Sequence, residues 1–257
     1  MIGGAEQNPG NTALVIGGSG GLGSEICRRL SKRWPALYLT YRSRREPAEM
    51  LRRELSAHCL TAYGPLDLLD EAQISSVIRE ADAHSKGLGT VVFSAGVSIL
   101  QPYVADITDA QWTEVLQTEL LGFTRVVRAV LPVFRSHGRG NFVAVVSVAT
   151  SSFPPGDALS AVPKAGIEML CRAIAKEEGR YGIRANTVAP GIMNAGLGEQ
   201  FQRTLFKPQV WEDQRRRVPL KRFGEAGEVA EAVCYLASEQ SSYVTGHTII
   251  VDGGWRL

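Results

Sequence analysis

The chain has 257 residues and a formal net charge of +2, and 44% of its residues are hydrophobic and 21% charged. This composition is that of a globular protein with an apolar core. The net charge is too small for strong electrostatic binding to nucleic acid, so no nucleic-acid partner is expected. Because no apolar run could span a bilayer, and because residues 1–10 read as a short, flexible polar tail rather than a leader peptide, we expect a cytoplasmic protein with no membrane partner.

Short apolar runs alternate with longer amphipathic stretches along the whole chain. Strands are predicted at residues 13–16, 37–41, 60–63, 90–93, 142–146, 184–188 and 248–251. Several of these runs lack polar alternation, as expected for strands that helices cover on both faces. The pattern predicts one doubly wound α/β domain over the whole chain, with a seven-stranded parallel sheet and helices on both faces.

Three long helices are predicted from the same pattern. They cover about 109–135, 158–179 and 226–238, and a capping box of Thr108 and Gln111 opens the first. The four cysteines and four histidines show no metal-ligand spacing, so no metal site is predicted.

A glycine-rich turn, GGSGGLG at residues 17–23, joins the first predicted strand to the following helix. Glycines let the backbone approach a pyrophosphate closely, and a helix N-terminus offers it N–H groups and a positive dipole end. Many such runs are plain turns, but this one lies inside a βαβ unit, as a dinucleotide site requires. The residues predicted to bind the dinucleotide here are Gly17, Ser19, Gly21, Leu22 and Gly23.

The end of the second strand indicates which dinucleotide is bound. An NAD site usually offers an acid to the ribose hydroxyls there, whereas an NADP site offers positive charge to the 2′-phosphate. The chain reads YRSRR at residues 41–45, with no acid until Glu46. Arg42 and Ser43 are therefore predicted to bind the 2′-phosphate, and NADP(H) is favoured over NAD(H). The alternative is a solvated loop of basic residues.

The glycine spacing resembles the fingerprint of the short-chain dehydrogenase/reductase family, although Ile16 stands where the family usually has Thr. Further matches follow in chain order, with Asp67 after the third strand, SAG at 94–96, RANTVAPG at 184–191 and VDGG at 251–254. The resemblance covers nearly the whole chain, is strongest to members like the 3-oxoacyl-carrier-protein reductases, and implies a Rossmann fold. It adds these cofactor-binding residues: Asp67, Ser94, Ala95, Gly96, Lys164, Pro190, Gly191 and Ile192.

The same resemblance implies a catalytic set of Asn, Ser, Tyr and Lys, which this chain keeps only in part. Ser147 matches the Ser, and Lys164 matches the Lys that also binds the nicotinamide ribose. Ser160 stands at the Tyr position, four residues before Lys164, and Glu119 stands at the Asn position. An aliphatic hydroxyl is a far weaker acid than a phenol, so ordinary Tyr-dependent ketone reduction requires another proton source.

Three interpretations stay open. In the first, the chain is an NADP(H) oxidoreductase of altered chemistry on a carbonyl or conjugated substrate, including acyl thioesters, as in the dienoyl-CoA reductases that carry Ser-x-x-x-Lys. Ser147, Ser160, Lys164 and Glu119 would then be catalytic, unless Glu119 is a structural carboxylate at a subunit interface. In the second, the chain is an inactive subunit that pairs with an active homologue. In the third, it is an isomerase or cyclase that uses the cofactor as a platform.

Two regions bear on substrates and partners. Residues 194–218 fall where the family carries its substrate lid. Their apolar surface and basic rim would suit a thioester substrate. The alternative is an amphipathic helix with a solvated charged face. The residues concerned are Phe201, Leu205, Phe206, Lys207, Trp211 and Arg215 to Arg217. Family members pack the helices matching 109–135 and 158–179 against a neighbour, which implies a homo- or hetero-oligomer.

Overall fold

The computed structural model describes residues 11–98, 101–204 and 207–257, so the predicted tail at 1–10 lies outside it. The described residues form one parallel sheet in the order β3-β2-β1-β4-β5-β6-β7, which confirms the predicted doubly wound α/β fold. Its strands are β1 (Thr12–Ile16), β2 (Ala36–Tyr41), β3 (Leu60–Pro65), β4 (Leu88–Phe93), β5 (Gly140–Val145), β6 (Ile183–Pro190) and β7 (Thr248–Val251).

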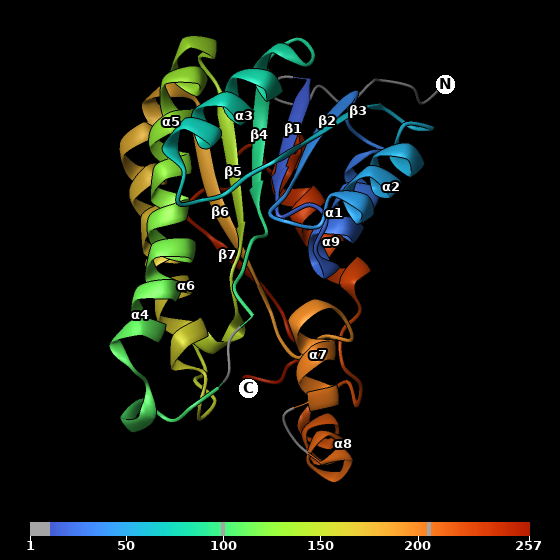
Figure 1. The fold of residues 1–257 in the computed structure, drawn as a ribbon, viewed down its shortest axis with the longest axis vertical. Coiled ribbons are helices and arrows are strands. Elements are labelled where there is room, and N and C mark those ends of the chain that lie inside the picture. The colour runs from blue at the N-terminus through green and yellow to red at the C-terminus, as the bar shows by residue number, and fades with distance from the viewer. Residues whose placement is uncertain (1–10, 99–100, 205–206) are drawn as a thin grey trace.

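Helices cover both faces of the sheet. Figure 1 shows α3, α5 and α6 on one face and α1, α2 and α9 on the other, while α7 and α8 lie beyond the carboxyl ends of the strands. The α-helices are α1 (Gly21–Leu30), α2 (Arg45–Leu55), α3 (Glu71–Ala83), α4 (Asp109–Val115), α5 (Leu121–His137), α6 (Ala158–Glu178), α7 (Gly196–Thr204), α8 (Pro208–Arg217) and α9 (Ala226–Ala237). Short turns are η1 (Val104–Asp106), η2 (Leu116–Leu120), η3 (Val148–Thr150), η4 (Gly179–Tyr181) and η5 (Glu239–Ser241).

The central strands are completely buried because each face of the sheet has its own apolar core. On the α5 face, four phenylalanines interlock, with ring centroids 4.9 Å apart for Phe93 and Phe123 and 5.0 Å apart for Phe134 and Phe142. Tilted aromatic contacts of this kind add to the free energy of apolar burial. They hold α5 against β4 and β5 and so fix the polypeptide that precedes α5.

The helix predicted at 109–135 begins as expected but is not regular. The capping box of Thr108 and Gln111 is present, whereas a π-helical turn, η2, separates α4 from α5. The N–H of Leu121 donates to the carbonyl of Leu116, one residue further back than in an α-helix. A π turn inserts one residue into the helix and is often found at functional sites. The helix predicted at 109–135 is therefore present, but the sequence did not predict its π turn, in which Glu119 lies.

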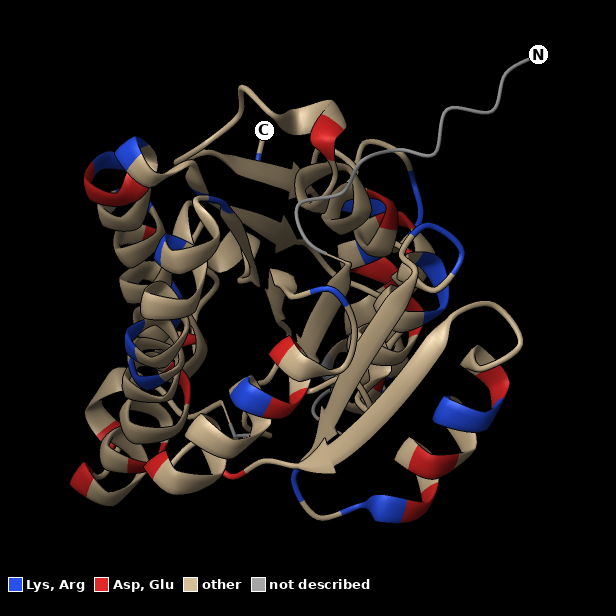
Figure 2. Cartoon of the chain, turned by 90° about the horizontal axis from the view of Figure 1, so that it is seen from above, with Lys and Arg blue, Asp and Glu red and all other residues tan. Residues whose placement is uncertain are grey.

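Charged side chains lie mainly on the outer helices. Figure 2 shows acidic and basic residues interleaved along them in this view, consistent with the net charge of +2. Within the described part of the chain, no helix has both the length and the apolar character needed to cross a membrane.

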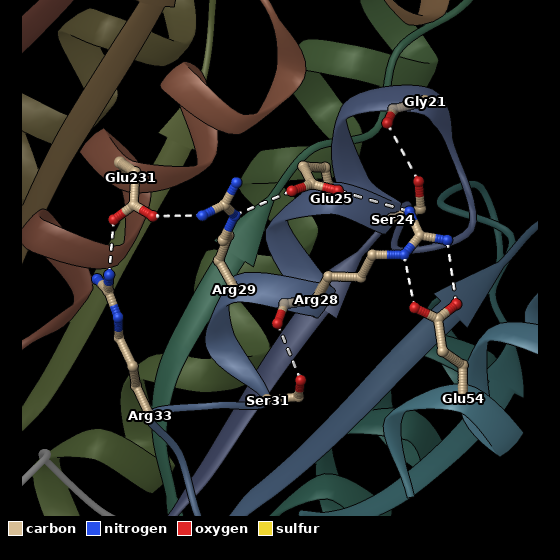
Figure 3. Close-up of polar contacts among 9 residues, drawn as sticks. All are labelled: Gly21, Ser24, Glu25, Arg28, Arg29, Ser31, Arg33, Glu54 and Glu231. Carbon is tan, nitrogen blue, oxygen red and sulfur yellow. Dashed lines mark hydrogen bonds and ion pairs between the residues drawn. The ribbon is translucent and has the colours of Figure 1, made fainter. Parts of the chain in front are cut away.

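Ion pairs join α1 to two neighbouring helices (Figure 3). Glu231 of α9 lies 3.0 Å from the guanidinium of Arg29 and 2.6 Å from that of Arg33. Arg28 makes two hydrogen bonds to Glu54 of α2, at 2.8 and 3.2 Å. The glycine-rich turn at the start of α1 is therefore carried by a helix that is tied at both sides.

Candidate functional site

The loops that follow β1 and β4 meet at the point where the strand order reverses. Such a switch point leaves a crevice outside the carboxyl ends of the strands, where open α/β sheets bind their ligands. The N–H of Ser94 donates to the carbonyl of Ile16 at 2.9 Å. A Cβ added to Gly17, whose φ is +76°, would lie 2.9 Å from the backbone of Ala95. Glycine at position 17 thus allows the two loops to touch.

A cavity opens at this crevice. The predicted cofactor residues among its lining are Gly17, Ser19, Arg42, Ser43, Asp67, Ser94, Ala95 and Gly96. The prediction missed Ile16, Gly20, Thr40, Tyr41, Arg44, Leu66, Leu68, Val97 and Thr118, which mostly flank the predicted positions in sequence. Glu119, predicted as a catalytic candidate, also lines it.

The first turn of α1 suits a pyrophosphate. Gly21, Leu22 and Gly23 form this turn, and no side chain within the described residues caps it. A Cβ on Gly23 would lie 2.2 Å from the carbonyl oxygen of Gly17, so a side chain there would push the turn apart. Uncapped N–H groups, the helix dipole and a glycine turn together fit a dinucleotide phosphate.

The basic end of β2 is held beside this turn. The N–H of Gly17 donates to the Thr40 hydroxyl at 3.1 Å. Arg42, Ser43 and Arg44 follow with exposed side chains at the cavity. Further along the cavity, the Asp67 carboxylate accepts the N–H of Leu69 at 2.9 Å, so its own loop orients it.

The segment after β6 does not line this cavity. Pro190 ends β6, the N–H of Gly191 donates to the carbonyl of Val251 at 2.9 Å, and the carbonyl of Ile192 accepts the N–H of Gly224 at 3.0 Å. These bonds place the three residues at the carboxyl edge of the sheet, against β7 and the loop before α9.

The catalytic candidates Lys164 and Glu119 form a buried ion pair. The Lys164 ammonium lies 2.7 Å from Oε2 of Glu119, and Oε1 of Glu119 accepts the N–H of Val97 at 2.9 Å. The exposed fractions are 9% for Lys164 and 1% for Glu119. Glu119 is therefore not a carboxylate at a subunit interface, as one sequence interpretation held, because it is enclosed within its own chain.

The two serine candidates lie after β5 and at the start of α6. Ser147 follows β5, and its hydroxyl oxygen accepts the N–H of Ala149 at 3.1 Å, which leaves the hydroxyl proton to be donated elsewhere. Ser160 lies in the first turn of α6 and is partly exposed. Among the described residues, no tyrosine hydroxyl makes a hydrogen bond to Lys164 or Ser147.

Asp157 is a candidate that the sequence interpretation missed. It is 7% exposed, precedes α6, and accepts a hydrogen bond from the Gln101 amide at 2.8 Å. Burial raises the pKa of Asp157 to about 6, although the positive charge of Lys164 and the Gln101 hydrogen bond oppose the shift. The signal was available, because residues 157, 160 and 164 have the i, i+3, i+7 spacing of one helix face.

The region predicted as a lid contains α7 and α8. A Cβ on Gly21 would lie 2.4 Å from the Cα of Gly196, so the start of α7 touches the glycine-rich turn. Trp211 packs edge-on against Phe223, with ring centroids 6.3 Å apart. Leu205, Phe206 and the side chain of Phe201 lie outside what the structure describes.

The basic rim predicted for this region is partly neutralised by local ion pairs. Arg215 and Arg216 both pair with Glu212, at 2.7 and 3.2 Å. These two arginines are therefore not a free cationic rim. Over the described ranges, no group of three or more His, Cys, Asp or Glu side chains is arranged to hold a metal ion.

Known proteins resemble this chain over most of its length. A family profile described as enoyl-(acyl carrier protein) reductase matches residues 17–256. The 3-oxoacyl-[acyl-carrier-protein] reductase of Staphylococcus aureus is 27% identical over 96% of this chain and 98% of its own length. The NADP-dependent mannitol dehydrogenase of Alternaria alternata is 30% identical, over 96% and 92%. A gluconate 5-dehydrogenase from Burkholderia cenocepacia, solved with NADP and tartrate, has a TM-score of 0.87 at 27% identity, covering 96% of this chain and 95% of that one.

Proposed function

Since the chain belongs to the short-chain dehydrogenase/reductase family, we propose that it is an NADP(H)-dependent oxidoreductase acting on a carbonyl or conjugated substrate. One observation supports this most directly. The glycine-rich turn, the basic end of β2 and the carboxylate that holds Lys164 all line one cavity. Ligand sites of open α/β sheets lie at such a switch point and gather a few polar groups there, as these three features do.

NADP(H) is the proposed cofactor because positive charge replaces the expected acid at the end of β2. Arg42 and Ser43 would hold the 2′-phosphate, with Arg44 beside them. The first turn of α1 would hold the pyrophosphate, and Asp67 would contact the adenine. Bound there, the nicotinamide would exchange hydride with the substrate. Two of the relatives above are named or solved with NADP.

The chain's own groups would orient the reacting oxygen and the ribose. Ser147 would donate its hydroxyl proton to the substrate oxygen, with Ser160 assisting. An ammonium has three N–H donors, and Glu119 accepts from Lys164, so donors remain for the ribose hydroxyls. Glu119 is therefore proposed as a positioning residue that holds the ammonium in place, and the Glu119–Lys164 contact takes over from the family's Asn.

A small carbonyl compound or an acyl thioester is the proposed substrate. The printed names of the family profile and of the Staphylococcus relative point to acyl groups on a carrier protein, and residues 194–218 are proposed as the lid over the substrate. A homo- or hetero-oligomer through α4, α5 and α6 is also proposed. Leu121, Val162 and Met169 support it, since they expose 40%, 47% and 60% of their surface on these helices.

Cofactor binding is tested by titrating the purified chain with NADPH and NADH and following nicotinamide fluorescence. The R42A variant should bind NADPH at least about tenfold more weakly, because a charge-assisted hydrogen bond is worth roughly 1.5–3 kcal/mol. Its affinity for NADH should not change. R128A, which removes an exposed arginine of α5 that pairs with Glu71, is the control. An R42A variant that loses equal affinity for NADPH and NADH would contradict the assignment of the 2′-phosphate site.

Activity is tested with the same protein against ketones, enones and acyl thioesters. NADPH oxidation with turnover supports the proposal. NADPH binding without turnover, or co-purification with an active homologue, would favour the inactive subunit instead. Product formed without net NADPH oxidation would favour an isomerase or cyclase.

A further inference from the structure

Two successive turns of α6 bind the loops that follow β4 and β5. Lys164 pairs with Glu119, whose second carboxylate oxygen accepts the N–H of Val97 in the loop after β4. One turn further along α6, Oε1 of Glu168 accepts a hydrogen bond from the Thr150 hydroxyl at 2.8 Å, in the turn after β5. Residues four apart lie on one face of a helix, so α6 holds both loops from the same face.

Thr150 ends the short turn η3, and this turn fixes the position of Ser147. The Ser147 hydroxyl oxygen accepts the N–H of Ala149 at 3.1 Å. The Ser147 carbonyl accepts both the N–H of Thr150, at 3.2 Å, and its hydroxyl, at 2.9 Å. The direction of the Ser147 side chain is therefore set by where η3 places the amide of Ala149. A single turn has little stability of its own, because its few hydrogen bonds do not offset the entropy of ordering it, so η3 needs contacts from outside.

Glu168 supplies the directional contact between η3 and α6. Within the part of the chain that the structure describes, its carboxylate makes no ion pair, and the Thr150 hydroxyl is its one hydrogen-bond donor. The buried side chains of Val148 and Ala149 also hold the turn, but apolar contacts have no preferred direction. A hydrogen bond to a carboxylate is stronger than one between neutral groups. The single hydroxyl proton of Thr150 lies between the Glu168 carboxylate and the Ser147 carbonyl, so one side chain links both.

We propose that Glu168 is a positioning residue, which acts through Thr150 to orient the Ser147 hydroxyl toward the substrate oxygen. The inference rests on the proposed reductase function, in which Ser147 donates a hydrogen bond to that oxygen. Glu168 and Thr150 hold η3 in place against α6, the helix that carries Lys164, so the serine hydroxyl keeps its place relative to the ammonium. Such positioning matters because a displacement of about 1 Å at a catalytic group can cost roughly 100-fold in rate.

The test measures NADPH oxidation with two probes, ethyl acetoacetate and acetoacetyl-CoA. T150V keeps the shape of the side chain but removes its hydroxyl, so kcat should fall at least about tenfold while the Kd for NADPH stays unchanged. T150S keeps the hydroxyl and should restore the wild-type kcat. E168L should match T150V, whereas E168Q, whose amide oxygen still accepts a hydrogen bond, should keep most of the activity.

The matched controls are T124V and E177L, which should both behave as wild type. Thr124 is exposed on α5, and its hydroxyl bonds only to the Leu120 carbonyl of its own helix turn. Glu177 is exposed near the end of α6.

A double-mutant cycle separates the positioning of Ser147 from a general loss of structure. In an S147A background no hydroxyl is left to orient, so T150V should not lower the single-turnover rate further. The proposal is overturned if T150V lowers the rate by the same factor with and without Ser147. It is also overturned if T150V and E168L both keep the wild-type kcat.

A second measurement does not depend on turnover. Hydrogen exchange of the Ala149 amide, followed by NMR of the ¹⁵N-alanine-labelled chain, reports on its bond to the Ser147 hydroxyl oxygen. This amide should exchange at least about tenfold faster in T150V and E168L than in the wild type, and at the wild-type rate in T150S. Unchanged exchange in T150V and E168L overturns the positioning role, whether or not the chain is active. A wild-type chain that reduces neither probe, with exchange changed as expected, overturns the proposed function alone.

Discussion

At the scale of single residues, the Glu119–Lys164 contact is the interaction on which the site depends most. Both groups are buried, and among the described residues each is the other's only ion-pair partner. Burying two charges is expensive, and their attraction together with the Val97 hydrogen bond offsets that cost only while both partners are present. Position 119 is thus under a structural constraint as well as the proposed functional one.

Replacing Glu119 with Ala should lower the free energy of unfolding by about 3 kcal/mol, because the Lys164 ammonium would stay buried without its partner. Urea denaturation followed by circular dichroism measures the change. E114A, an exposed position of α4 one turn earlier, should change stability by less than about 0.5 kcal/mol. An E119A variant as stable as E114A would show that the pair is not needed for folding.

The titration of Asp157 should also be visible in stability. Its pKa is raised from 3.8 to about 6 in the folded chain, so between these values the folded state holds a proton that the unfolded state has lost. The stabilising contribution of this group is therefore complete below pH 3.8 and is lost as the pH rises through about 6.

Other carboxylates act in the opposite direction, since Arg222 lowers the pKa of Glu228 to about 2. The useful quantity is therefore the stability of D157N minus that of the wild type. It should grow by roughly 3 kcal/mol between pH 4 and pH 7, two pKa units at 1.36 kcal/mol each. Urea denaturation at several pH values measures this difference. A difference that does not change with pH would contradict the raised pKa.

At the scale of elements, α1 must stay in place if its first turn is to bind the proposed phosphate. Its apolar face packs in the core with α9, and the ion pairs of Arg29 and Arg33 with Glu231 add to that packing (Figure 3). These side chains are 38–44% exposed, so solvent screens their attraction and the pairs contribute only modestly.

The E231Q variant should lose about 0.5–1 kcal/mol of stability at low salt and less at high salt. It removes the ion pairs of Glu231 with Arg29 of α1 and with Arg33, three residues after that helix ends, and salt screens exposed charges. E49Q is the matched control, since the ion pair that Glu49 makes among the described residues lies within α2, with Arg53 one turn away. Thermal unfolding at two salt concentrations gives both values. If E49Q loses as much stability as E231Q, the ion pairs of Glu231 contribute no more to stability than an ion pair within one helix.

At the scale of the whole molecule, the described chain leaves apolar side chains exposed on α5 and α6, including Leu121, Val162 and Met169. Exposed apolar groups gathered on neighbouring helices are typical of subunit interfaces. The helices that carry them are those that the family resemblance implies for oligomer formation.

A V162E/M169E double variant should therefore elute as a monomer of 27.8 kDa, whereas the wild type should form a larger species. Charges placed in an apolar interface would have to be desolvated without partners. Light scattering after size-exclusion chromatography measures the mass. M50E, which changes an equally exposed methionine of α2, should keep the wild-type mass. A monomeric wild type would contradict the proposed oligomer.

Local pattern alone was enough to predict the fold, and it also suggested one half of the proposed site. The positions of the apolar runs predicted the bounds of the strands to within a few residues, as the match of 248–251 to β7 shows. The glycine turn and the basic end of β2 were predictable because their roles depend on backbone freedom and charge at fixed sequence positions. Residues 190–192 lie at the carboxyl ends of the strands but do not line the cavity. Sequence order alone cannot show which of these loops turn toward it.

The other half of the site depends on contacts between residues far apart in sequence. The sequence shows Glu119 and Lys164 and places Ser160 four residues before the lysine, but the 2.7 Å contact of Glu119 with Lys164 depends on the π turn and on the packing of α5 against the sheet. The raised pKa of Asp157 follows from burial by the fold, which also bonds it to Gln101. Backbone propensity is a local property that sequence carries directly, whereas burial and electrostatic environment are created only when distant segments pack together.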